Sequence, residues 1–246
     1  MTSGSWLGAA RQVHAEVGST NDLALAWAKD GAPHGAIVTA DAQTAGRGRH
    51  GRTWASPPGR SLYLSIVVRL GPTVPVPPLT LAVGVGVCAA IRAEGVAAAG
   101  LKWPNDVLVA STAGAPRKLA GVLCESTGDA VVIGIGVNAN GAAAELPPEI
   151  AARATTIGEA LGRWIDRDAL LERLLDELVP WIERYQAGGV AAIAPAWTAH
   201  MLPALRVRTD RGTGAARGLG ADGALIVAGD DGRDHRVTSG DVEWIA

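Results

Sequence analysis

A loop rich in glycine and arginine lies between two apolar segments and carries residue types that hold anions. Residues 46–54 read Gly-Arg-Gly-Arg-His-Gly-Arg-Thr-Trp, which places Arg47, Arg49 and Arg52 within six positions. Guanidinium groups fork onto carboxylate and phosphate oxygens, and glycines let the backbone come close to a ligand. The pattern indicates a site that brings two anions together. A solvated loop, or an RNA contact of the RGG type, is the alternative interpretation of the same composition.

Three further clusters stand at the ends of apolar runs. Residues 102–106 read Lys-Trp-Pro-Asn-Asp, Lys118 precedes Leu-Ala-Gly, and residues 134–138 read Gly-Ile-Gly-Val-Asn. Taken singly, the first has the composition of a turn with a salt bridge, and the second that of a lysine at the edge of a strand. The third formally fits a dinucleotide fingerprint. We reject that interpretation because Pro147 and Pro148 follow, where a phosphate-binding helix should run.

The sequence lacks the common motifs of covalent catalysis and of phosphate loops. It contains no Gly-x-Ser-x-Gly elbow and no Walker loop. Its two cysteines and five histidines are too scattered to indicate a disulfide scaffold or a protein-held metal site. A nucleotide would therefore be held without a P-loop.

The elements that must position these clusters follow from the apolar patterns. Ser19 begins a helix that Gly31 and Pro33 end. Downstream we expect strands at 36–40 and 61–69, a buried helix at 79–94, one strand at 101–109 interrupted by Pro104, strands at 118–125 and 130–137, and an amphipathic helix at 166–185 kinked at Pro180. Short runs at 205–209, 215–220, 225–228 and 235–238 have hairpin spacing. The prediction is an α+β fold with a mixed-sheet domain flanked by helices over residues 1–200 and a small β-barrel over residues 201–246.

Composition excludes several classes of protein. Of 246 residues, 48% are hydrophobic and 19% charged, which excludes global disorder. A net charge of -2 argues against a nucleic-acid binder. The longest nearly apolar run, residues 79–91, is too short to cross a membrane, and the N-terminus does not have the pattern of a secretory signal. We expect a cytoplasmic protein with neither a membrane nor a nucleic-acid partner.

Seven motifs in order resemble the biotin protein ligases, which are biotin–[acetyl-CoA carboxylase] ligases. They are Ser-Thr-Asn at 19–21, Gln43 with the loop at 46–54, Ser-Pro-Pro-Gly at 56–59, Leu-Tyr-Leu-Ser at 62–65, Lys-Trp-Pro-Asn-Asp-Val at 102–107, Lys-Leu-Ala-Gly-Val-Leu at 118–123 and Gly-Ile-Gly-Val-Asn at 134–138. The tail, with Ser-Gly-Asp-Val at 239–242, resembles the small SH3-like C-terminal domain of that family. For the part of the chain that precedes this tail, the resemblance implies a catalytic domain of the class II synthetase-like, lipoate-ligase-like fold.

The resemblance also implies a reaction with two steps. Biotin and ATP, with Mg²⁺ bound through the ATP phosphates, give biotinoyl-5′-AMP, and biotin then passes to a lysine of the biotin carboxyl carrier protein of acetyl-CoA carboxylase or a related enzyme. Such chemistry needs no enzyme nucleophile, which agrees with the lack of a convincing Ser-His-Asp or Cys-His order in the sequence. The sequence leaves open whether the protein is a monomer or a homodimer.

The family's site residues carry over to matching positions of this chain. The resemblance implies biotin binding by Ser19, Thr20, Asn21, Gln43, Gly46, Arg47, Gly48, Arg49, Lys118, Gly121 and Gly134. It implies ATP binding by Arg49, Arg52, Lys102, Asn105, Asp106 and Asn138, and catalytic roles for Arg47, Arg49 and Lys118. Trp54 and Trp103 are expected to support the site rather than to contact substrates.

Two departures and two alternatives accompany the resemblance. Eighteen residues precede Ser19, too few for a helix-turn-helix, so we expect no operator-binding repressor activity. Residues 139–160 contain none of the aromatic residues with which some relatives cover adenine. Lipoate ligases and octanoyl transferases share the catalytic fold and are the alternative enzymes. An RNA-binding module is the non-enzymatic alternative, and it would need a basic balance and more aromatic residues beside the loop.

Overall fold

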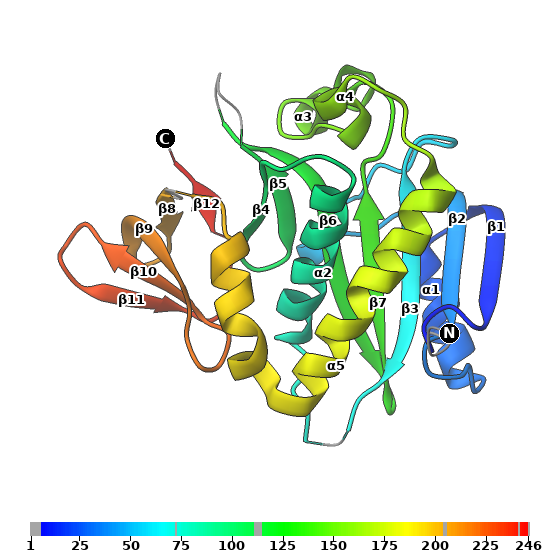
Figure 1. The fold of residues 1–246 in the computed structure, drawn as a ribbon, viewed down its shortest axis with the longest axis horizontal. Helices are drawn as coiled ribbons and strands as arrows, with labels where there is room; N and C mark the ends of the chain where they lie inside the picture. The colour runs from blue at the N-terminus through cyan, green and yellow to red at the C-terminus, as the bar shows by residue number, and fades with distance from the viewer. Residues whose placement is uncertain (1–5, 72, 111–114, 204–205, 241, 246) are drawn as a thin grey trace.

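The protein folds around two β-sheets connected by a long helix (Figure 1). The computed structural model describes residues 6–71, 73–110, 115–203, 206–240 and 242–245. The first sheet has seven strands in the order β1-β2-β3-β7-β6-β5-β4, and the second has five in the order β11-β10-β9-β8-β12. The strands of the first sheet are β1 (Arg11–Val17), β2 (Ile37–Gln43), β3 (Leu62–Arg69), β4 (Ala99–Lys102), β5 (Asp106–Val109), β6 (Arg117–Thr127) and β7 (Ala130–Val137).

The first sheet is mixed, as the sequence predicts. Strands β1 and β2 run parallel and the other neighbours antiparallel. Strands β3 and β7 are almost continuously buried, because helices cover both faces of the sheet there. Figure 1 shows α2 (Leu79–Ala93) and α5 (Arg167–His200) together on the near face and α1 (Thr20–Lys29) behind the sheet. The remaining helical segments are η1 (Arg49–Gly51), η2 (Ala143–Glu145), α3 (Pro148–Ala151) and α4 (Ile157–Leu161).

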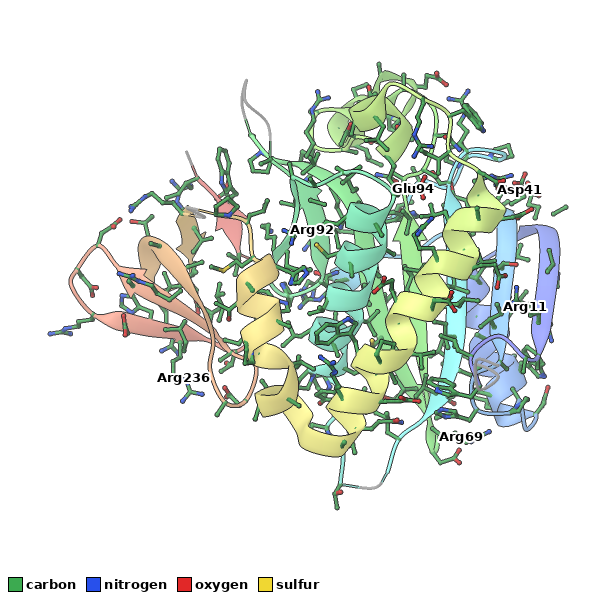
Figure 2. The ribbon with its side chains drawn as sticks, in the orientation of Figure 1. Arg11, Asp41, Arg69, Arg92, Glu94 and Arg236 are labelled. Atoms are coloured by element: carbon green, nitrogen blue, oxygen red, sulfur yellow. The ribbon has the colours of Figure 1, made fainter. Side chains whose placement is uncertain are left out.

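Helix α2 is the buried helix that its apolar run predicts. At Gly86 an added Cβ would lie 3.0 Å from the Leu178 side chain, so the glycine allows α5 to pack closely. Glu94, at the end of α2 in Figure 2, accepts a hydrogen bond from Arg163 at 2.8 Å and forms an ion pair with Arg173 of α5 at 3.4 Å. The two helices therefore form one layer over the sheet.

Helix α5 is longer than predicted, and its break lies elsewhere. The sequence indicates a helix over 166–185 kinked at Pro180, whereas α5 runs to His200 and departs from helical dihedrals at Gly189 (φ 59, ψ -150). Figure 1 shows the chain turning sharply there, so that the second half of α5 reaches the C-terminal sheet. Pro180 is accommodated inside the packed helix, whereas Gly189 adopts dihedral angles that other residues avoid. The bend therefore lies at the glycine and not at the proline.

The structure differs from the sequence-based expectations in three further places. The single strand at 101–109 is a hairpin, because β4 and β5 pair antiparallel with Lys102 opposite Asp106, and the turn between them holds the cis Trp103–Pro104 peptide. Strand β1 was missed because it is an edge strand whose side chains are mostly polar and exposed. The short helices α3 and α4 were also not predicted.

The C-terminal sheet is the small β domain that the sequence predicts. Its strands are β8 (Arg206–Thr209), β9 (Gly212–Leu219), β10 (Leu225–Gly229), β11 (Asp234–Val237) and β12 (Glu243–Trp244), and all neighbours are antiparallel. It docks on the first sheet through Trp103, whose indole N–H donates to the carbonyl of Gly223 at 3.0 Å. The domain boundary at residue 200 stays a prediction. Leu205 and Asp241, within the predicted strand at 205–209 and the motif at 239–242, lie outside the described residues.

In the described part of the chain, none of the helices combines the length and apolar character needed to cross a membrane.

Candidate functional site

A buried network of polar side chains surrounds the start of α1. The backbone N–H and the hydroxyl of Thr20 both lie within hydrogen-bond distance of Gln43 Oε1, at 2.9 and 3.2 Å. Gln43 Nε2 donates to Ser56 Oγ at 2.9 Å. Ser65 Oγ lies 2.8 Å from Thr20 Oγ1 and 2.5 Å from Asn21 Oδ1. Thr20, Asn21, Ser56 and Ser65 are buried and Gln43 is half-buried, so these groups form a compact set of donors and acceptors that is largely removed from water.

Ser19 has the backbone position of the predicted helix cap, but its side chain makes no capping hydrogen bond. Ser19 is buried, as is the neighbouring Thr20. The hydroxyl that the sequence assigns to helix capping is thus not used for that purpose, which is compatible with the binding role that the resemblance implies for Ser19.

Glycines of the central strands make room for two side chains above the sheet. A Cβ at Gly134 would overlap the amide of Asn21, and one at Gly136 would overlap the Trp54 indole. At Gly121 a Cβ would meet the same indole at 3.0 Å. The Trp54 indole N–H is buried and, within the described residues, has no hydrogen-bond partner. The Trp54 indole therefore packs over the strands that carry Gly121 and Gly136, and its supporting role stays a prediction.

Lys118 stands between a carboxylate and an aromatic face. Its Nζ is 2.6 Å from Asp106 Oδ1 and 5.1 Å from the centroid of the Trp54 ring. The side chains of Lys118 and Asp106 are 29% and 19% exposed, although the Asp106 Oδ1 atom that Lys118 contacts is itself buried. The turn between β4 and β5 and the start of β6 thus bring together two residues that the sequence separates.

The arginine loop closes on itself as a small hairpin. Gly48 N–H donates to the Arg52 carbonyl at 2.6 Å, and Trp54 N–H donates to the Gly46 carbonyl at 2.9 Å. Arg49 Nη1 lies 3.5 Å from Asn105 Oδ1, which places that guanidinium beside the turn after β4. The loop therefore extends from the polar network toward Lys118 and Asp106.

Arg47 is held at the other side of the loop. Its Nη2 is 2.8 Å from Glu125 Oε2 and 2.8 Å from Asp22 Oδ1. Glu125 on β6 also accepts a hydrogen bond of 2.6 Å from Asn21 Nδ2. Neither acidic residue belongs to a motif that marks it as a site residue in the sequence. The one signal for Glu125 in the sequence is its place two residues after the motif at 118–123.

Two asparagines brace the nucleotide side expected from the sequence. Asn138 Nδ2 donates to the carbonyls of Lys118 at 3.2 Å and Thr155 at 3.1 Å. Asn105 Nδ2 donates to the carbonyl of Val122 at 2.9 Å. In this structure these amide nitrogens therefore fix the backbone around Lys118, while Lys102 ends β4 just before the turn.

Most of the sequence-predicted site residues gather on one side of the first sheet. The contacts above join α1, the end of β2, the arginine loop, the β4–β5 turn, β6 and β7, with Arg52 following η1. Among the described residues, no three His, Cys, Asp or Glu side chains are grouped so that they could hold a metal ion. The arrangement offers buried hydrogen-bonding groups at one end, an indole in the middle and cations at the other.

Comparisons with known proteins place this chain in a family. Residues 14–138 match the model of the biotin/lipoate A/B protein ligase family. The biotin–[acetyl-CoA-carboxylase] ligase of Mycobacterium tuberculosis is 37% identical over 242 residues, covering 94% of this chain and 87% of that protein. The Paracoccus denitrificans protein of the same name is 34% identical over 233 residues, covering 89% and 94%.

A solved structure agrees with these relatives over both sheets. The biotin protein ligase of Aquifex aeolicus, in complex with biotin and ATP, has a TM-score of 0.82 at 29% identity and covers 96% of this chain and 99% of its own. This confirms the resemblance drawn from the motifs and the predicted fold class. The chain belongs to the biotin/lipoate A/B protein ligase family.

Proposed function

We propose that this protein is an ATP-dependent biotin ligase. It activates biotin as biotinoyl-5′-AMP and transfers the biotinoyl group to a lysine of the biotin carboxyl carrier protein of acetyl-CoA carboxylase or a related enzyme. The observation that carries the proposal is the order of groups along one face of the sheet. The buried network around Thr20 and Gln43 leads past Trp54 to Lys118 and Asp106.

The buried network suits a ureido head group. Such a group has two N–H donors and one carbonyl acceptor, and Thr20, Asn21 and Gln43 offer hydroxyl and amide partners of both kinds. A buried site built for hydrogen bonding rejects ligands that lack the matching groups, because its own polar atoms would be left unpaired. This favours biotin over lipoate or octanoate, which have no ureido group.

The first step joins two anions. A carboxylate oxygen of biotin attacks the α-phosphorus of ATP, the bond from that phosphorus to the bridging oxygen breaks, and pyrophosphate leaves. Cations held in place offset the repulsion between the reactants and stabilise the charge that develops. We assign this role to Lys118, whose ammonium would leave Asp106 and pair with the reacting oxygens. Arg49, which contacts the neighbouring Asn105, would assist it.

The nucleotide side uses the residues around the β4–β5 turn. We place Arg52, Lys102, Asn105, Asp106 and Asn138 there, with Arg49 shared between the two substrates. Magnesium, when bound with ATP, neutralises phosphate charge. The described residues offer no protein cluster for it, so it would be held through phosphate oxygens with Asp106 as a nearby carboxylate.

The second step needs no nucleophile from this chain. The ε-amine of the carrier lysine attacks the acyl carbon of the mixed anhydride, AMP leaves, and the amine loses a proton. The loop at 46–54 would hold the intermediate until the lysine arrives. The absence of operator-binding activity remains a prediction from the sequence.

Transfer to a carrier domain tests the proposal. The purified protein, ATP, Mg²⁺ and biotin are incubated with a biotin carboxyl carrier domain, and the mass of the carrier is measured. We expect a gain of one biotinoyl group that requires both ATP and the acceptor lysine. A carrier that stays unmodified with biotin, or is modified with lipoate instead, would contradict the proposal.

A further inference from the structure

The charge of Arg47 is already matched by two carboxylates. Its Nη2 lies 2.8 and 3.1 Å from the two oxygens of Glu125 and 2.8 Å from Asp22 Oδ1. Asp22 comes from the first turn of α1 and Glu125 from β6. The arginine therefore joins the loop to two elements of the domain instead of presenting an unmatched positive charge.

Glu125 has a second contact that Asp22 lacks. Its Oε2 accepts a hydrogen bond of 2.6 Å from Asn21 Nδ2, and the opposite atom of that amide, Oδ1, is 2.5 Å from Ser65 Oγ. A carboxylate accepts and does not donate, so it fixes which end of the Asn21 amide faces β6. The carboxylate of Glu125 therefore sets the orientation of the Asn21 amide, and with it the direction of the hydrogen bond between Asn21 and Ser65.

We propose that Glu125 is a positioning residue that clasps the arginine loop onto the buried network. Through Arg47 it holds the loop against the body of the domain, and through Asn21 it orients the amide beside Thr20. The proposal rests on the proposed function for the identity of the ligand, biotin. It also gives Arg47 the role of a clasp, and leaves Lys118 and Arg49 as the cations that meet the reacting groups.

The location of Glu125 makes it suitable as an anchor. It lies on β6, opposite Val132 of β7 in the centre of the sheet, and its side chain is 30% exposed. The loop it holds contains Gly46, Gly48 and Gly51, and ordering such a segment costs conformational entropy. Hydrogen bonds to charged groups are stronger than neutral ones and can offset part of that cost.

Two variants separate the two contacts. Glu125→Met has nearly the same length and removes both, whereas Asp22→Asn weakens one side of the Arg47 pair and leaves Asn21 untouched. Glu125→Gln is the milder second variant if Glu125→Met folds poorly, since it keeps size and polarity but loses the charge. Thermal unfolding verifies that each variant is folded.

The first measurement needs no ligand. Limited trypsin digestion of the free protein is followed by mass spectrometry at Arg47, Arg49 and Arg52. We expect both Glu125 variants to be cut there faster than the parent, by about tenfold for a lost charge-assisted hydrogen bond, and Asp22→Asn to fall between. Equal cleavage of the parent and the Glu125 variants would overturn the clasp.

The second measurement is biotin affinity by calorimetry. Glu125→Met should bind biotin at least about tenfold more weakly, while Asp22→Asn should stay within about threefold of the parent, since it leaves the Asn21 amide oriented. Equal losses in the two variants, or no loss in Glu125→Met, would overturn the role through Asn21. A parent protein that binds no biotin would contradict the proposed function, whereas the digestion would still decide whether the clasp exists.

Discussion

Position 134 has no room for a side chain, because the amide of Asn21 lies directly over Gly134. An alanine Cβ at this position would overlap that amide, which would have to move away from Ser65 and Glu125. We expect Gly134→Ala to weaken biotin binding by about tenfold or more, the loss expected from one displaced buried hydrogen bond. Calorimetry with biotin measures it.

Gly84→Ala is the matched control for that substitution. Gly84 lies inside α2, where an added Cβ would make an ordinary contact of 3.4 Å with Leu101. Its biotin affinity should equal that of the parent. An unchanged affinity in Gly134→Ala would show that the position of Asn21 does not matter for binding.

Lys118→Ala tests the cation assigned to the first step. The substitution removes the ammonium that lies between Asp106 and the Trp54 ring, on an otherwise well-paired strand. We expect formation of biotinoyl-AMP to fall by about two orders of magnitude or more, as when a group that stabilises transition-state charge is lost, with thermal unfolding little changed. Adenylate formation at the parental rate would remove Lys118 from the mechanism.

His34 makes the stability of the protein sensitive to acid. Its Nδ1 accepts a hydrogen bond of 3.0 Å from the backbone N–H of Arg69, the last residue of β3, which is labelled in Figure 2. Burial, and then the charge of Arg69, lower the pKa of His34 below its ordinary value. The unfolded chain therefore binds the proton more readily, so this contribution to stability is complete above about pH 6.5 and is lost as the pH falls below it.

His34→Asn isolates that effect, because the asparagine carbonyl can accept the same N–H without titrating. We expect the free energy of unfolding to fall less between about pH 7 and about pH 5 in the variant than in the parent. Denaturant titrations at several pH values measure the difference. Parallel pH profiles would exclude His34 as the source.

At the scale of the residue, the sequence identified most of the groups that meet in the site. Thr20, Gln43, Lys118 and Asp106 were found through motifs and do contact one another in pairs. Glu125 was not found, because an acidic residue at the end of an apolar strand has no spacing that marks it. Its importance depends on which side chains the fold brings to it.

The elements were predicted well where an apolar pattern was long. The buried helix at 79–94 and the strands at 118–125 and 130–137 correspond to α2, β6 and β7. The strand expected at 101–109 failed because both halves are apolar and the turn between them is short. Strand β1 failed because an edge strand with solvated side chains lacks a strong apolar pattern.

The break in α5 gives a prediction at the scale of the element. Gly189 has φ 59 and ψ -150, a region that is almost restricted to glycine. Gly189→Ala should lower the free energy of unfolding by about 1–3 kcal/mol. Gly84→Ala, at a helical glycine, should be neutral or slightly stabilising in comparison. Denaturant unfolding compares the two, and equal stabilities would contradict the assigned strain.

At the scale of the whole molecule, the two sheets are joined by a contact that the sequence does not reveal. The sequence predicts two regions in the correct order, but it does not show that Trp103 would donate across to Gly223 of the C-terminal sheet. Such contacts join residues more than a hundred positions apart, and no local pattern encodes them. The same turn carries Asn105 and leads into Asp106 at the start of β5, so the C-terminal sheet supports the part of the site that we propose binds the nucleotide.

Trp103→Phe tests that support. It removes the indole N–H and part of the buried ring, so we expect a loss of about 1–3 kcal/mol in the free energy of unfolding. We also expect a higher KM for ATP with little change in the KM for biotin. Trp244→Phe, within the C-terminal sheet, is the control. A rise in both KM values, or in neither, would contradict a specific link to the nucleotide side.

Biotin-dependent exchange between ATP and pyrophosphate tests the central claim most directly. It requires the first step to run in both directions and involves no carrier protein. Radiolabelled pyrophosphate should enter ATP when biotin is present, and not with lipoate, octanoate or no acid. Exchange with lipoate or octanoate but not biotin, or no exchange with any acid, would contradict the assignment of this site to biotin activation.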